Sequence, residues 1–177
     1  MKNELFELTR RRRSVRRYGN AEIDEQIIDE IMKIALTAPT AFGNKDVSFV
    51  VVRDKNLIRA IGECKTYGGY QINGADTVIV VMVKTSNPRN AEFWIEDGAI
   101  ASTYLLLAAE QYGLGCCWVH IRNRNGKEKT SDEEIRKLLN ISNDYTVLNL
   151  VALGEKGEIK KAYTEKDLDY TKIEKIF

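Results

Sequence analysis

Four short runs of apolar residues are the first pattern along the chain. Each run is too short and too rich in β-branched residues to form a helix, which favours buried strands. The predicted strands are Ser48–Arg53, Thr77–Lys84, Cys116–Ile121 and Thr146–Leu153.

Between these runs, apolar residues recur at helical spacing. One helix is predicted to begin after Asp24, a good N-cap, and to end at the Ala38–Pro39 step. Its repeating apolar positions are Ile27, Ile28, Ile31, Ile34 and Ala35. Shorter helices are predicted over residues 3–10 and Lys55–Glu63.

A further helix is predicted from Ser131 through Leu139. Ser131 has the side chain of an N-cap, and Glu134 lies three residues later, so the pair predicts a capping box.

The longest helical candidate is Ala91–Tyr112, and the stretch Gly113–Leu114–Gly115 should stop it. It carries apolar or small residues on nearly every side: Gly98, Ala99, Ile100, Ala101, Leu105, Leu106, Leu107 and Ala108. A helix that is apolar all round is buried all round. A chain of 177 residues cannot easily wrap such a helix alone, so the pattern predicts dimerisation.

Four strands mixed with helices predict an α+β fold, an α/β sandwich, in one domain spanning 1–177. The segment 155–177 is highly charged but carries Ile173, Ile176 and Phe177. These apolar side chains need cover, and a partner subunit would supply it.

The composition excludes several classes of protein. Hydrophobic residues at 44% and charged residues at 30% are typical of a soluble globular chain, and the net charge of +1 argues against a nucleic-acid-binding or membrane-binding surface. The N-terminus lacks the apolar core of a signal peptide, and no run reaches the roughly 18 apolar residues of a membrane helix. We therefore expect a cytoplasmic protein with reduced thiols at Cys64, Cys116 and Cys117.

The chain has little catalytic equipment of its own. His120 is the only histidine, which excludes histidine-built metal sites, and no HExxH or CxxC motif occurs. Cys116 and Cys117 lie too near His120 in sequence for a typical nucleophile–base pair. A bound cofactor is therefore expected to carry any reaction, with no catalytic side chain and no metal.

Three stretches are candidates for holding that cofactor. Arg10–Arg17 (RRRRSVRR) places guanidinium groups around a hydroxyl, a combination that suits phosphate, although a solvated loop or a nucleic-acid patch has the same composition. Ala38–Phe49 is a small polar loop that would let a flat ring approach the backbone, or is an ordinary connection. Gly113–His120 (GLGCCWVH) places glycines before a strand with Trp118, a residue more often found in a core.

Taken together and in order, these stretches resemble the nitroreductase family. Arg12–Tyr18 (RRSVRRY) is similar to its N-terminal signature, and Ala38–Val52 to its Ala–Pro–Ser/Thr–Ala loop and following strand. Asp97–Val119 resembles its long central helix with Gly–Leu–Gly and Cys–Trp. Ile121–Arg124 and the closing Val–Ala–Leu–Gly strand with Lys–Lys resemble a short-form branch.

The resemblance implies a mixed, mainly antiparallel sheet flanked by helices, in an intertwined homodimer with two FMN sites at the interface. The cofactor-binding residues that it implies are Arg12, Arg13, Ser14, Arg16, Gly43, Asn44, Trp118, Val119, His120, Ile121, Lys160 and Lys161. The family's Asn–x–Gln–Pro–Trp is replaced here, so either Gly43 or Asn44 takes the position near the ring.

The resemblance also implies a ping-pong reaction in which NADH or NADPH reduces FMN and an electron-poor acceptor, a nitroaromatic or quinone, is then reduced. Alternatives are another flavin reaction on the same scaffold (dehalogenation, flavin breakdown or peptide dehydrogenation), flavin binding without turnover, and nucleic-acid binding through Arg10–Arg17.

Overall fold

The computed structural model describes residues 3–88 and 91–177. Its centre is a four-stranded sheet of order β1-β2-β4-β3. The strands are β1 (Val47–Val52), β2 (Thr77–Lys84), β3 (Gly115–His120) and β4 (Tyr145–Gly154), and all neighbours pair antiparallel. The four predicted strands are confirmed to within one residue at each end.

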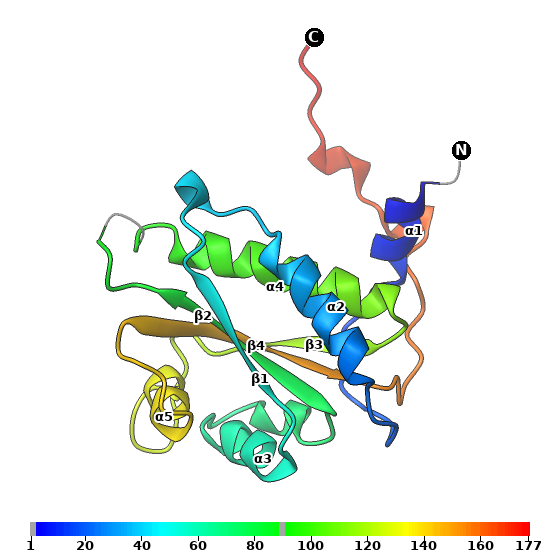
Figure 1. Ribbon diagram of the computed structural model, residues 1–177. Coiled ribbons are helices and arrows are strands. Elements are labelled where there is room, and N and C mark those ends of the chain that lie inside the picture. The colour runs from blue at the N-terminus through cyan, green and yellow to red at the C-terminus, as the bar shows by residue number, and fades with distance from the viewer. Residues whose placement is uncertain (1–2, 89–90) are drawn as a thin grey trace.

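Helices cover both faces of the sheet, as Figure 1 shows. α2 (Glu25–Leu36) and α4 (Trp94–Gln111) lie on one face, while α3 (Lys55–Glu63) and α5 (Ser131–Leu138) lie on the other. α1 (Glu4–Arg11) packs beside α4, near the C-terminal segment. The predicted α+β sandwich is therefore confirmed, and β1 and β3 are left as the two edge strands.

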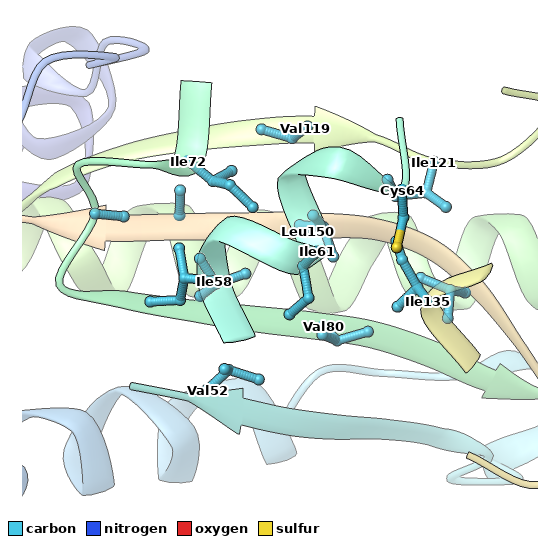
Figure 2. Packing of buried hydrophobic residues seen from close by; sticks show 14 of the residues in the cluster. Val52, Ile58, Ile61, Cys64, Ile72, Val80, Val119, Ile121, Ile135 and Leu150 are labelled. Carbon is cyan, nitrogen blue, oxygen red and sulfur yellow. The ribbon is translucent and has the colours of Figure 1, made fainter. Parts of the chain in front are cut away.

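The alternating direction of side chains along each strand divides the core into two clusters. In β2, Val78 and Val80 contribute to the cluster under α3, whereas Ile79 and Val81 contribute to the cluster under α2 and α4. Figure 2 shows the first cluster, in which Val119 of β3 and Ile121 pack toward α3 and α5. This packing fixes the orientation of β3.

Two helix predictions need correction. The capping box consists of Thr130 and Glu133, one residue earlier than predicted, and the hydroxyl of Ser131 is buried instead. Glu134 accepts hydrogen bonds from the amides of Glu128 and Lys129, so it serves the preceding loop rather than the helix. Both Thr130–Glu133 and Ser131–Glu134 satisfy the capping pattern, and burial of Ser131 decides between them.

The long helix begins at Trp94, later than the predicted Ala91, and it is not buried all round within one chain. Leu105 and Ala109 are buried against the sheet, but Ile100 on another face is 37% exposed. The apolar side chains at 173, 176 and 177 are exposed as well. Within the described residues no helix is long and apolar enough to cross a membrane.

Candidate functional site

The arginine segment Arg10–Arg17 lies along the open edge of β3. The amide of Val15 donates to the carbonyl oxygen of Cys116 at 2.9 Å, and Ser14 forms a parallel bridge with Cys116. The strands of the sheet pair antiparallel, and this bridge adds one parallel contact at the edge of β3. The structure therefore brings together the early arginines and the late glycine-rich strand.

Gly115 makes this close approach possible. A Cβ atom at position 115 would lie 2.7 Å from Cγ1 of Val15, closer than packed atoms come. Val15 itself is 3% exposed and faces away from solvent. The chain can run against the strand only because residue 115 has no side chain.

The C-terminal segment holds the arginine segment from a second side. The amide of Gly157 donates to Arg17 at 3.0 Å, and the amide of Tyr163 donates to Arg10 at 2.9 Å. The guanidinium of Arg13 lies 4.5 Å from the ring centre of Tyr163 and also donates to the carbonyl oxygen of Lys161. Stacking and hydrogen bonding fix the position of Arg13.

Glu158 orders the segment further. Its carboxylate accepts a hydrogen bond from the amide of Arg16 at 2.8 Å and pairs with Lys160 at 2.9 Å. The Arg16 amide, followed by Lys160, lowers the pKa of Glu158. Lys160 and Lys161 are thereby brought next to the arginine segment, as the sequence predicted. Glu158 and Tyr163 were missed, because no local sequence signal marks a contact with so distant a segment.

The open edge of β3 presents backbone groups beyond Cys116. In an antiparallel strand the N–H and C=O of one residue point to the same side and alternate along the chain. Since the Cys116 carbonyl faces Val15, the backbone groups of Trp118 and His120 also face away from β4. Among the backbone pairings of the described residues, only Ser14 and Val15 reach that side, and the Trp118 carbonyl accepts a hydrogen bond from the Cys117 thiol at 3.4 Å.

The side chains of Trp118 and His120 share one face of β3. Their rings are stacked, with centroids 6.5 Å apart and planes inclined by 15°. The pKa of His120 is lowered by burial and then by the positive charges of Arg124, Arg122 and Lys65. His120 is therefore a neutral imidazole at neutral pH, and Val119 and Ile121 anchor the strand in the core.

The cysteines are free thiols inside the fold. Burial raises the pKa of Cys116 to about 12, and burial likewise raises the pKa of Cys117. A thiol that stays protonated is a poor nucleophile. Within the described part of the chain, no group of three or more His, Cys, Asp and Glu residues could hold a metal ion.

Gly43 and Asn44 lie apart from the arginine segment and β3. They belong to the turn η1 (Ala41–Gly43) and its C-cap, immediately before β1, the edge strand opposite β3. Two strands lie between these edges, so the two regions are separated by about 14 Å of sheet. The Nδ2 atom of Asn44 is buried without a hydrogen-bond partner among the described residues. One chain alone does not bring Gly43 and Asn44 to the arginine segment.

Comparison with known proteins decides the family. The model of the nitroreductase family matches residues 9–71 and 63–155. The chain belongs to this family. A Methanothermobacter thermautotrophicus protein named "Putative NADH dehydrogenase/NAD(P)H nitroreductase" is 31% identical over 157 residues, covering 89% of this chain and 80% of that protein.

A solved structure of similar sequence shares the whole nitroreductase fold. The FMN-dependent nitroreductase from Clostridium difficile R20291 is 36% identical, with a TM-score of 0.89 over 94% of this chain and 96% of that one. A more distant match is human iodotyrosine deiodinase 1, which is 30% identical over 129 residues, or 71% of this chain and 40% of that protein.

Proposed function

We propose that this nitroreductase-family chain is an FMN-dependent oxidoreductase, which accepts a hydride from NADH or NADPH and then reduces an electron-poor acceptor. Nitroaromatics and quinones are the proposed acceptors, in a ping-pong cycle. The observation that carries the proposal is the arginine segment held along the open edge of β3 by the Val15–Cys116 contact. The similar proteins named for FMN and for NAD(P)H support the choice of cofactor and donor.

The residues present fit FMN. Arg12, Arg13 and Arg16 flank Ser14 in the sequence, at the end of β3 where Ser14 bridges to Cys116, and such donors suit a phosphate dianion. Lys160 and Lys161 add positive charge from the C-terminal segment. Farther along the strand, the amide N–H groups of Trp118 and His120, which face away from β4, offer hydrogen bonds to the polar edge of a flat ring.

FMN, when bound, supplies the two-electron chemistry. The chain's own contribution is to bind and orient. When FMN binds, the arginines would neutralise the phosphate charge, the edge of β3 would position the ring, and the Trp118 and His120 side chains, which stack on each other, would lie next to it. No side chain is assigned as an acid or base, because the thiols stay protonated and the bound flavin would supply the electron chemistry.

We infer that the functional unit is a homodimer. The exposed face of α4 lines an apolar hollow of about 380 Å³ with residues from α1 and α2, chiefly Leu5, Leu8, Ile34, Tyr104 and Leu107. Burial of such a face in a second copy removes apolar surface from water. A second copy also offers the missing polar group: Asn44 of the partner subunit is proposed to complete the site.

The absorbance spectrum of the purified protein tests the proposal. We expect a flavin spectrum that bleaches when NADH or NADPH is added without oxygen and returns when a nitroaromatic is added. Protein that is colourless and stays colourless after incubation with FMN would show the proposal to be wrong.

Reductive dehalogenation is a second candidate, favoured by the similarity to iodotyrosine deiodinase 1. The reduced protein separates the two candidates. Release of iodide from an aryl iodide, with no reoxidation by nitroaromatics, would favour dehalogenation.

A further inference from the structure

A second cluster of positive charge lies at the C-terminal end of β3. Lys65, His120 and Arg124 line one open hollow of about 310 Å³. The other residues that line it are neutral: Thr66, Tyr67, Asn123 and Asn125. Arg122 is close enough to lower the pKa of His120. We call Lys65, Arg122 and Arg124, together with the neutral imidazole of His120, the cationic cluster.

The cationic cluster has no acidic partner. Among the described residues, no carboxylate oxygen lies within 4.0 Å of a side-chain nitrogen of these four residues. Neighbouring cations are paired: Lys127 lies 2.9 Å from Glu63, and Arg136 lies 3.0 Å from Asp132. The Nε atom of Arg122 is buried without any acceptor in the described chain. Arg122 does not itself line the hollow, so its charge attracts an anion there without direct contact.

The walls of the hollow are held in place by hydrogen bonds. The amide of Thr66 donates to Asn125 at 3.0 Å, which joins the end of α3 to the loop after β3. The amide of Arg124 donates to Ile121 at 3.0 Å, and the Arg124 carbonyl accepts from Ser131 at 2.8 Å. Lys65, His120 and Arg124 therefore line a preformed hollow, and binding need not order a loop.

We propose that the cationic cluster binds an oxyanion, a carboxylate or a phosphate, carried by the reactant that exchanges electrons with FMN. Guanidinium and ammonium groups are the donors that proteins use for both oxyanions. The stacking of His120 on Trp118 joins the hollow to the part of β3 where the ring is proposed. This inference rests on the proposed function and adds a substrate class: acceptors with an anionic substituent, or the phosphates of the nicotinamide nucleotide.

A matched pair of acceptors tests the proposal. For 4-nitrobenzoate against neutral 4-nitrobenzamide, we expect the ratio of kcat/KM values to fall about tenfold in Arg124→Gln, the loss typical of one charged hydrogen bond. Arg124→Lys should retain most of the preference. Arg59→Gln, which removes an exposed charge from α3 outside the hollow, should leave the ratio unchanged.

Kinetics with the nicotinamide nucleotide distinguish the two carriers of the oxyanion, which are the acceptor and the nucleotide. If Arg124→Gln leaves the acceptor ratio unchanged but lowers kcat/KM for NADPH or NADH about tenfold, the cluster binds nucleotide phosphate. If both quantities match those of Arg59→Gln, the inference is wrong. It is also wrong if Arg124→Gln weakens FMN binding to the same extent, because the cluster then belongs to the cofactor site.

A binding measurement that needs no turnover tests the anion site separately from the proposed function. His120 is the only histidine, so its imidazole gives a single set of NMR signals. Addition of 4-nitrobenzoate or inorganic phosphate should raise the pKa of His120, and 4-nitrobenzamide should not. A protein that binds no FMN yet shows this rise would refute the flavin proposal alone, whereas an unchanged pKa with every anion would refute the anion site.

Discussion

The amide of Val15 donates to the carbonyl oxygen of Cys116 at 2.9 Å, and Gly115 leaves the space that this contact needs. The contact places a run of arginines beside the unpaired edge of a strand. Charge for a phosphate and outward-facing backbone N–H groups for a ring are thus available on one edge of one sheet. Four predictions follow from this arrangement and its surroundings.

Loss of single arginine charges should weaken FMN binding. Arg12→Gln and Arg16→Gln should each raise the Kd for FMN about tenfold, because each removes a charged donor to the phosphate. Arg17→Gln, whose backbone carbonyl still accepts from Gly157, is the matched control and should stay within about twofold. Titration of flavin fluorescence measures the Kd. Equal effects at all three positions would indicate general electrostatic attraction in place of a defined phosphate site.

A methyl group at position 115 should push the arginine segment away from β3. Gly115→Ala places a Cβ 2.7 Å from Cγ1 of Val15, and we expect destabilisation of about 1–3 kcal/mol together with weaker FMN binding. Urea unfolding and flavin titration provide the two readouts.

Val15→Ala provides the control for this clash. It removes the atom that the new methyl would meet, so the double variant should be less destabilised than the sum of the two single variants. Additive effects on the free energy of unfolding would show that the contact does not limit the approach of the two segments.

Mixing two defective chains should restore flavin binding if the site is shared between subunits. One chain carries Arg12→Gln with Arg16→Gln, and the other carries Asn44→Ala. After joint unfolding and refolding, mixed dimers should hold one site with the arginines of one chain and Asn44 of the partner subunit.

Each variant refolded by itself is the control for this mixing experiment. Recovery of bound FMN above the average of the two controls supports the shared site. No recovery, in a sample shown by sedimentation to contain mixed dimers, would place both groups in the same subunit or exclude Asn44.

His120 should make the protein less stable at acidic pH. Burial and neighbouring cations lower the pKa of His120 in the folded chain below its ordinary value of 6.5, so the unfolded chain takes up a proton first as pH falls. The stabilisation is complete above about pH 6.5 and is lost as the pH falls through the lowered pKa.

Comparison with His120→Asn isolates this effect from the titration of carboxylates. The free energy of unfolding of the wild type, measured relative to the variant by urea titration, should decrease from about pH 8 to about pH 5. A difference that is constant or increases over this range would contradict the lowered pKa.

The local pattern of apolar and polar residues was sufficient to predict most of the helices and strands. The residues of α3 and β2 were predicted with their observed bounds, because apolar spacing and flanking polar residues define them without distant contacts. The capping box was placed one residue late, since two overlapping Ser/Thr-x-x-Glu patterns differ only in the burial of Ser131. Burial is a tertiary property.

The candidate site was likewise predictable from the sequence only in part. The arginine segment and the strand containing Trp118 were recognisable as candidates from residue type and order. The sequence did not reveal Glu158 and Tyr163 as the residues that order the arginines, nor Lys65 as a neighbour of His120. Such contacts depend on which distant segments the fold brings together.

The sequence by itself determined the elements and the family resemblance, because these depend on residue type and short-range spacing. Only the tertiary structure decided that Val15 pairs with Cys116, that Asn44 lies at the opposite edge, and that Lys65 and Arg124 line one hollow with the neutral His120. The physical reason is strand order: β2 and β4 occupy the centre, so β1 and β3 become separate edges with different neighbours.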